Sequence, residues 1–138
     1  TGCLVFKYTM SCEAFLQLDG QIYPLGTGFG GNGLTDLQLC DFDRNGHLDL
    51  VYSFSWGSGI HRAQLGHFNL TTRTETILSY ASMLSELYLV PLLPNRVIVY
   101  AADSAIAEGN FANITLHRQE KLAEITADGG ELAITPLD

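Results

Sequence analysis

Apolar and polar side chains alternate with a period of two along most of this chain, and this alternation limits the fold more than any other feature. The alternating runs are rich in β-branched and aromatic residues, which is the composition of half-buried strands. They predict strands near residues 4–10, 13–18, 21–25, 36–41, 48–55, 62–69, 74–79, 86–93, 96–101, 112–117 and 130–135. Short strands at a spacing of roughly 8 to 12 residues predict an all-β, antiparallel fold, arranged as a sandwich, a small barrel or a partial propeller-like meander.

Turn residues separate several of these runs. Asp19-Gly20 lies between two alternating runs and predicts a two-residue hairpin turn, in which both central residues need positive φ. Pro94-Asn95 separates two apolar runs in the same manner, and the Asp-Gly-Gly sequence at 128–130 closes a last hairpin. Consecutive strands joined by such turns are expected to pair as antiparallel neighbours.

The helical signal is thin by comparison. The run 116–125 fits a helix or a strand equally well. One short segment places four side chains on a single helical face, namely Tyr80, Met83, Leu84 and Leu87. We therefore expect little or no helix.

Length, charge and cysteine content exclude several classes of protein. The 138 residues fit one domain, 1–138, that is large enough to bury its own core. A net charge of −8 argues against a nucleic-acid partner, because a phosphate backbone needs clustered Lys and Arg. No run approaches the roughly 20 apolar residues of a membrane-spanning helix. Three cysteines without a CxxC spacing predict neither a zinc site nor a disulfide framework.

The start of the chain carries no Met and no charged-then-apolar leader. We interpret the chain as a mature segment or a fragment from which any targeting signal has been removed. The expected location is extracytoplasmic, either secreted or tethered to a membrane through a segment that precedes residue 1.

The sequence Asp-Phe-Asp-Arg-Asn-Gly-His-Leu-Asp, residues 41–49, is the strongest local motif. Oxygen-bearing side chains occupy positions 1, 3, 5 and 9 of this loop, position 6 is a glycine, and position 7 offers its carbonyl oxygen. This spacing is typical of an EF-hand-type calcium loop, because the odd side chains point inward and the glycine makes the sharp turn. The candidate ligands are Asp41, Asp43, Asn45, His47 and Asp49.

Two interpretations of this loop remain open. Tyr52 stands where a helix-loop-helix site has its bidentate Glu, and the following residues form a strand pattern, so a metal site here would be of a strand-loop-strand type. Three carboxylates without that Glu predict a dissociation constant of roughly 10⁻⁴ to 10⁻³ M for calcium. The same residues also fit a plain hairpin turn at Asn45-Gly46, with the aspartates exposed to water.

The run Asp-Phe-Asp-Arg-Asn-Gly-His-Leu-Asp-Leu-Val, residues 41–51, resembles the calcium loop of FG-GAP and VCBS repeats. These repeats occur in integrin-α propellers and in secreted bacterial proteins. The resemblance implies calcium as cofactor and the five ligands named above, with His47 acting through its carbonyl. More faintly, residues 22–70 resemble extracytoplasmic domains of Gram-positive bla-regulator-type membrane proteins, some of them attached to membrane metallopeptidases.

Motifs of known catalytic sites are missing from the sequence. The four histidines form no HExxH motif, and no GxSxG elbow or Ser-x-x-Lys motif occurs. We therefore expect a protein that is not an enzyme. A pair of carboxylates that meets only in the folded chain, as in a glycan-acting hydrolase, stays an alternative.

A Gly-Ser loop near the middle of the chain groups an aromatic side chain with two basic ones: Trp56, His61 and Arg62. Aromatic and cationic side chains together are typical of recognition surfaces. The other interpretation is a wide hairpin connection with Trp56 folded over the edge of the sheet.

These observations predict a non-catalytic extracytoplasmic binding or sensing module with a structural calcium loop. Its partner would be a peptide, a glycan or a protein. The alternatives are an accessory or sensor domain of a membrane-bound regulatory peptidase, and a glycan-acting hydrolase.

Overall fold

The computed structural model describes residues 3–8, 13–26, 33–41, 48–57, 62–82, 86–93, 95–102, 120–128 and 131–137. These residues form eleven β-strands and no helix. The strands are β1 (Cys3–Lys7), β2 (Ala14–Leu18), β3 (Gln21–Leu25), β4 (Gly33–Cys40), β5 (Asp49–Trp56), β6 (Arg62–Asn69), β7 (Thr74–Ser82), β8 (Glu86–Leu93), β9 (Arg96–Ala102), β10 (Glu120–Asp128) and β11 (Glu131–Pro136). The expected all-β class is confirmed.

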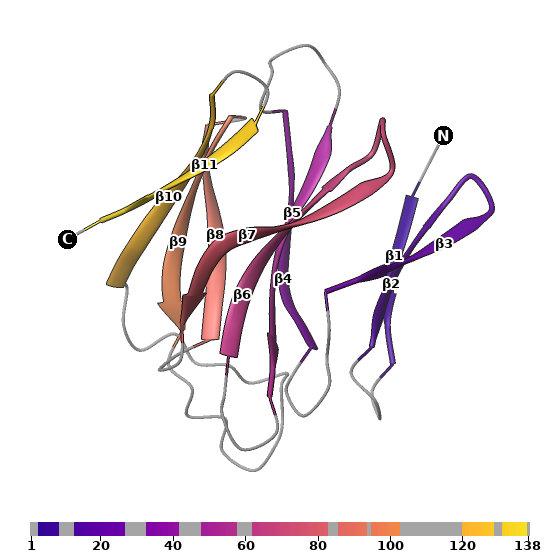
Figure 1. The fold of residues 1–138 in the computed structure, drawn as a ribbon, viewed down its shortest axis with the longest axis horizontal. Coiled ribbons are helices and arrows are strands. Elements are labelled where there is room, and N and C mark those ends of the chain that lie inside the picture. The colour runs from indigo at the N-terminus through magenta and orange to yellow at the C-terminus, as the bar shows by residue number, and fades with distance from the viewer. Residues whose placement is uncertain are drawn as a thin grey trace.

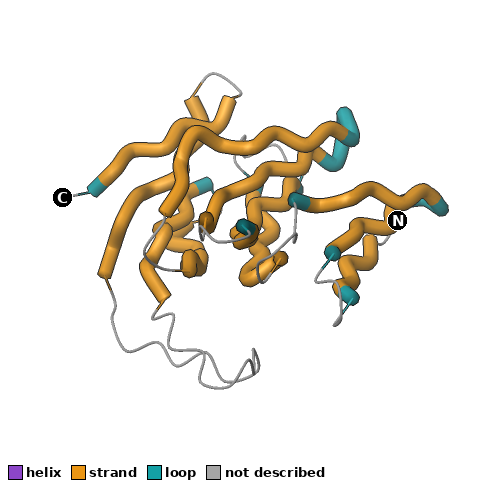
Figure 2. Tube along the Cα trace, turned by 60° about the horizontal axis from the view of Figure 1, so that its bottom comes forward, coloured by secondary structure: helices purple, strands orange, loops and turns teal. Residues whose placement is uncertain are grey.

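The strands form three antiparallel sheets, and each sheet is a meander of consecutive strands (Figure 1). The first sheet holds β1-β2-β3, the second β4-β5-β6-β7, and the third β8 to β11 in the order β11-β10-β9-β8. Figure 2 shows the sheets as three layers, with the second between the other two. Each sheet is open, so the described residues form a layered sandwich rather than a closed barrel.

Most of the predicted strands coincide with observed ones within a few residues. The predicted turn at Asp19-Gly20 is also confirmed, because these residues join β2 to β3 with φ values of 51° and 80°. The strand predicted at 112–117 lies outside the described residues. The ambiguous run 116–125 contributes to β10, which the alternation did not assign.

The helical spacing of Tyr80, Met83, Leu84 and Leu87 does not produce a helix where the structure describes these residues. Tyr80 lies in β7 and Leu87 in β8, while Met83 and Leu84 lie outside the described residues. Both described side chains pack into the core between the second and third sheets. Burial against a neighbouring sheet therefore decides the local conformation, and the helical spacing is incidental.

The second sheet is buried on both faces, and its strand β5 runs through the middle of the molecule. Six consecutive residues of β5, from Leu50 to Ser55, are buried. One face of the sheet packs on the first sheet through a ring-rich core of Ala14, Leu16, Leu18, Leu25, Leu50, Tyr52, Phe54 and Phe68. The other face packs on the third sheet through an aliphatic core that includes Val51, Ala63, Leu65, Leu78, Leu87, Leu89, Val97, Val99, Ala123 and Ile125.

Two glycines make room for the rings of the first core. A Cβ at Gly66 would overlap the ring of Tyr52, and a Cβ at Gly26 would lie 2.7 Å from Cγ of Phe54. Gly26 also has a φ of 60°, a conformation that other residues adopt only with strain. The hydroxyl of Tyr52 donates to a carboxylate oxygen of Glu75, which also accepts a hydrogen bond of 2.7 Å from the Gly26 amide. The start of the segment that joins β3 to β4 is thereby fixed to β7.

The second and third sheets approach most closely where β4 runs beside β8. Asp36 of β4 accepts a 2.7 Å hydrogen bond from the amide of Leu89, and Ser53 donates a 2.8 Å bond to the carbonyl of Leu87. Gln38 donates to the carbonyl of Leu89 at 3.4 Å. Side chains of one sheet thus bind the backbone edge of the next.

Candidate functional site

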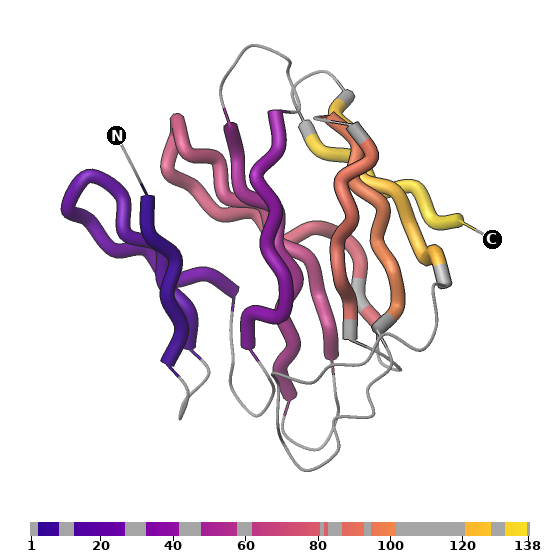
Figure 3. The backbone as a smooth tube through the Cα atoms, turned by 180° about the vertical axis from the view of Figure 1, so that it is seen from behind, coloured from indigo at the N-terminus to yellow at the C-terminus, as the bar shows by residue number. Residues whose placement is uncertain are grey.

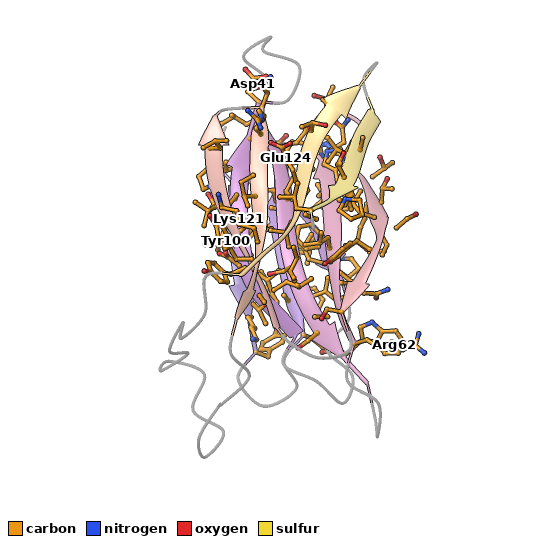
Figure 4. The ribbon with its side chains drawn as sticks, turned by 90° about the vertical axis from the view of Figure 1, so that its left-hand side faces the viewer. Asp41, Arg62, Tyr100, Lys121 and Glu124 are labelled. Carbon is orange, nitrogen blue, oxygen red and sulfur yellow. The ribbon has the colours of Figure 1, made fainter. Side chains whose placement is uncertain are left out.

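The two candidate sites lie at opposite ends of the second sheet. Figure 4 shows Asp41 at one end of the layers and Arg62 at the other. Asp49, a candidate metal ligand, begins β5, and Trp56 ends the same strand. The pairing of β5 with its neighbours therefore positions both candidate sites.

The candidate calcium loop connects β4 to β5. Cys40, the last residue of β4, pairs with Asp49, so the described ends of the loop, Asp41 and Asp49, leave and enter adjacent strands. This is the strand-loop-strand context that the sequence predicts. The other three predicted ligands, Asp43, Asn45 and His47, lie outside the described residues.

Both carboxylate oxygens of Asp49 accept hydrogen bonds from β6 and the turn that follows it. Oδ2 lies 3.1 Å from Nε2 of His67, and Oδ1 accepts a 3.3 Å bond from the amide of Leu70. The side chains of Asp49 and His67 are each only 14% exposed. These two contacts fix the orientation of the Asp49 carboxylate, as supporting hydrogen bonds do for ligands of metal ions.

The β6–β7 turn, which contains the Leu70 amide, is stabilised by its own hydrogen bonds. The side-chain oxygen of Asn69 accepts hydrogen bonds from the amides of Thr71 and Thr72, at 2.9 and 3.0 Å. Arg73 closes the turn with a φ of 58°, and its amide donates to the carbonyl of Asn69. Its guanidinium reaches Asp19 in the β2–β3 hairpin at 2.5 Å. The turn therefore links the start of β5 to the first sheet.

Cys40 is a buried thiol beside this acidic group. Burial raises the pKa of Cys40 to about 11, and the negative charge of Asp49 adds to the increase. At neutral pH the thiol is therefore protonated and unreactive. Cys40 belongs to the aliphatic core, where it acts as a small apolar side chain.

Among the residues that the structure describes, no three His, Cys, Asp or Glu side chains are grouped closely enough to hold a metal ion. The described ends of the loop nevertheless fit calcium in donor type, because both are aspartates and calcium prefers oxygen ligands. Asp49 enters this donor set already oriented by its two hydrogen bonds.

The second candidate site pairs Trp56 with Arg62 across β5 and β6. The two residues are direct register partners, and the guanidinium carbon of Arg62 lies 5.5 Å from the centre of the indole. The indole N–H donates a 2.6 Å hydrogen bond to the side-chain oxygen of Gln64. His61, the third predicted member, lies outside the described residues.

This arrangement supports parts of both interpretations of the Trp56 loop. The indole packs against the ring-rich core, as expected of a side chain folded onto the sheet. The guanidinium of Arg62 remains over the ring as part of an exposed residue. Gln64 was missed by the sequence analysis, although its place two residues after Arg62 puts it on the same face of a strand.

The chain matches no protein-family model, no curated protein and no solved structure. Within the described parts of the chain, no helix has the length and apolar character needed to cross a membrane.

Proposed function

We propose that this protein is a non-catalytic, extracytoplasmic binding module whose β4–β5 loop holds a structural calcium ion. The observation that carries the proposal is the geometry at the start of β5, where Asp49 is held in one orientation by His67 and Leu70. A carboxylate fixed in this way loses little conformational entropy when it binds a cation.

The proposed role of calcium is to neutralise the mutual repulsion of Asp41, Asp43 and Asp49. The ion would then hold the β4–β5 hairpin and, through the β6–β7 turn, the docking of the first sheet. Because the expected affinity is only about 10⁻⁴ to 10⁻³ M, such a site fills outside the cytosol and stays largely empty within it.

The proposed contact surface for a ligand is the opposite end of the second sheet, formed by Trp56, His61 and Arg62. A cation over an indole ring offers charge, a hydrogen-bond donor and apolar area together, which suits a peptide, a glycan or a protein surface.

Thermal unfolding in EDTA, in calcium and in magnesium tests the calcium part of the proposal. At about 5 mM calcium, a site with the expected affinity adds about 1–2 kcal/mol to the free energy of unfolding, which raises Tm by several degrees. Magnesium should give a smaller rise, because it demands a stricter octahedral shell. Three superimposable curves would contradict the proposal.

Two variants, one in the loop and one far from it, provide the control for this measurement. Asp43→Asn should abolish the calcium-dependent rise in Tm. Glu13→Gln, which changes an exposed acidic residue in front of β2, should leave it intact. If both variants show the same calcium-dependent rise in Tm, calcium acts on the net charge of the protein rather than at the loop.

A further inference from the structure

The first sheet has two edges, β1 and β3, and its hydrogen-bond pattern fixes which backbone groups point outward from β1. The amide of Tyr8 donates a 2.9 Å hydrogen bond to the carbonyl of Glu13, in continuation of the β1–β2 register. In an antiparallel pair, residues bonded in this way alternate with residues whose N–H and C=O point away from the partner strand. The amides and carbonyls of Cys3 and Val5 therefore point away from β2, toward the outside of the sheet.

The other edge strands of the first and third sheets each have a proline at an outward-pointing position. These prolines are Pro24 in β3, Pro91 in β8 and Pro136 in β11. Pro24 lies opposite a residue of β2 that bonds to β1, so it points away from β2. Pro136 precedes Leu137, whose amide bonds to β10, and Pro91 lies two residues after Leu89, whose amide bonds to a side chain of β4. Because proline has no N–H, a strand added at these positions lacks a hydrogen bond.

The edges of the second sheet, β4 and β7, are interrupted in other ways. The pairing of each with its neighbour contains a register shift, which breaks the regular spacing of outward groups. On β4, the carbonyl of Leu34 accepts a 2.9 Å hydrogen bond from the ammonium of Lys7, and the amide of Leu37 donates to the side chain of Asp36 at 2.8 Å. Figure 3 shows β1, β4 and β8 in succession across the molecule, so β1 lies beside edges that are already bonded.

β1 differs from all five of these edge strands. It contains no proline, its register with β2 is regular from Cys3 to Lys7, and no described strand pairs with its other side. Its outward N–H and C=O groups recur at every second residue. An extended peptide backbone offers acceptors and donors with the same repeat, whereas a sugar or a single charged group does not.

The side chains beside this edge indicate which peptide fits. Leu4, which is 57% exposed, and Phe6 point to the outer face of the sheet, while Val5 packs against the ring-rich core. An added strand places its own side chains next to these on both faces, so apolar and β-branched residues suit it. The net charge of −8 disfavours an acidic peptide.

We propose that the β1 edge binds an extended apolar peptide segment of a partner protein, which adds a fourth strand to the first sheet. Main-chain hydrogen bonds to Cys3 and Val5 supply the affinity, and the neighbouring side chains select the sequence. This binding goes beyond the contact surface proposed at Trp56, because it uses another sheet and the backbone rather than side chains. The prolines and register shifts of the other edges direct strand addition to β1.

Calorimetric titration with a synthetic peptide tests this proposal. The probe is the end-capped peptide Lys-Val-Thr-Val-Thr-Val-Lys, whose β-branched residues favour an extended chain and whose lysines oppose the charge of the protein. A dissociation constant below about 1 mM is expected. The peptide Lys-Val-Pro-Pro-Thr-Val-Lys lacks an N–H on each of its two edges and should bind at least about tenfold more weakly. Equal affinities, or no binding of the first peptide up to about 1 mM, would overturn the proposal.

Proline variants of the protein locate the binding edge. Val5→Pro removes an outward N–H and leaves the bonds to β2 in place, so it should raise the dissociation constant at least about tenfold. Cys3→Pro acts at the exposed first residue of β1 and provides the same test if circular dichroism shows that Val5→Pro does not fold. Unchanged affinity in a folded β1 variant would overturn the proposal.

Ile22→Pro is the matched control, because it places a proline at an outward position of the opposite edge, next to an exposed side chain. It should leave the dissociation constant unchanged. A loss of affinity as large as that of Val5→Pro would overturn the proposal, because the peptide would then not select β1.

Amide hydrogen exchange gives a readout that distinguishes this edge from other surfaces. The bound peptide should slow exchange of the Val5 amide at least about tenfold, while the amide of Phe6, which already points to β2, should change little. Slowing confined to the end of β5 at Trp56 would place the peptide on the other proposed surface and overturn the role of β1. Slowing at Val5 with increasing protein concentration alone would show that a second copy, rather than a peptide, occupies the edge, and would also overturn the proposal.

Discussion

The second sheet is held in different ways by its two neighbours. Its interface with the first sheet is built from large rings that fit against Gly26 and Gly66, and its interface with the third sheet is aliphatic. The third sheet is fixed in addition by two hydrogen bonds to the backbone of β8: the Asp36 carboxylate accepts from the Leu89 amide, and the Ser53 hydroxyl donates to the Leu87 carbonyl. The interface with the first sheet thus depends on the fit of large rings against two glycines. The interface with the third sheet combines apolar contact with hydrogen bonds to the backbone of an edge strand.

The largest expected effect is the loss of a ring from the first interface. Phe54→Ala should reduce the free energy of unfolding by about 3–5 kcal/mol, because it leaves a cavity beside Gly26 that the backbone is not able to fill. Leu89→Ala in the second interface removes fewer atoms, and we expect a loss of about 2–3 kcal/mol. Urea unfolding of both variants measures the difference. A larger loss for Leu89→Ala would mean that the aliphatic interface dominates stability.

The next effect tests the fit between Gly66 and Tyr52. Gly66→Ala should cost about 3 kcal/mol, since the added Cβ overlaps the Tyr52 ring and β6 lies within the sheet. In a Tyr52→Ala background the same substitution should cost little. A double-mutant cycle gives the coupling between the two positions. Additive losses would show that Gly66 acts through its own backbone and not through the ring.

The hydrogen bonds at the second interface should contribute less. Asp36→Asn places an amide N–H₂ near the amides of Leu37 or Leu89, and the lost acceptor should cost about 2 kcal/mol. Asp19→Asn is the comparison, because its ion pair with Arg73 is exposed to solvent and should contribute little to the free energy of unfolding. Equal losses in chemical unfolding would show that the bond to β8 is worth no more than a surface pair.

Alkaline pH should also weaken the two interfaces in sequence. The Cys40 thiol ionises near its ordinary pKa of 9.0 in the unfolded chain but only near 11 in the folded one. Stability should therefore fall from pH 9 upward, because the unfolded state loses its proton first. Burial and the hydrogen bond to Glu75 raise the pKa of Tyr52 above its ordinary value of 10.0. Ionisation of Tyr52 in the unfolded chain therefore lowers the free energy of unfolding only above about pH 10.

Two variants separate these contributions in unfolding curves measured across this pH range. Cys40→Ala should flatten the decline between pH 9 and 10. Tyr52→Phe should leave that part unchanged and flatten the decline above pH 10. If Cys40→Ala leaves the decline between pH 9 and 10 as steep as before, another group is responsible for it.

The strands were largely predictable from the sequence, because alternation reports burial on one face of a sheet. β10 was not assigned, and a register shift between Lys121 and Ala123 explains why, since a bulge changes which side chains face inward. A similar irregularity between Leu34 and Asp36 lies in the part of β4 that the prediction left out. The order in which the sheets pack was not predictable, because it depends on contacts between residues far apart in sequence.

The candidate sites, too, were only partly predictable from the sequence. The position of Asp49 at the start of a strand followed from its motif, and the pairing of Trp56 with Arg62 agrees with their grouping in the sequence. The contact between Asp49 and His67 spans 18 residues, and nothing in the spacing of the histidines indicated it. Local motifs therefore located candidate residues, whereas their partners depended on the register of β5 against β6.

The bonds between β4 and β8 have a consequence for the solubility of the protein. β8 is an edge strand, and an unprotected edge invites the addition of a foreign strand and the growth of aggregates. The amide of Leu89 and the carbonyls of Leu87 and Leu89 are already bound by side chains. Pro91, two residues further on, has no N–H to offer. The β8 edge of the third sheet is thereby closed to further β-pairing.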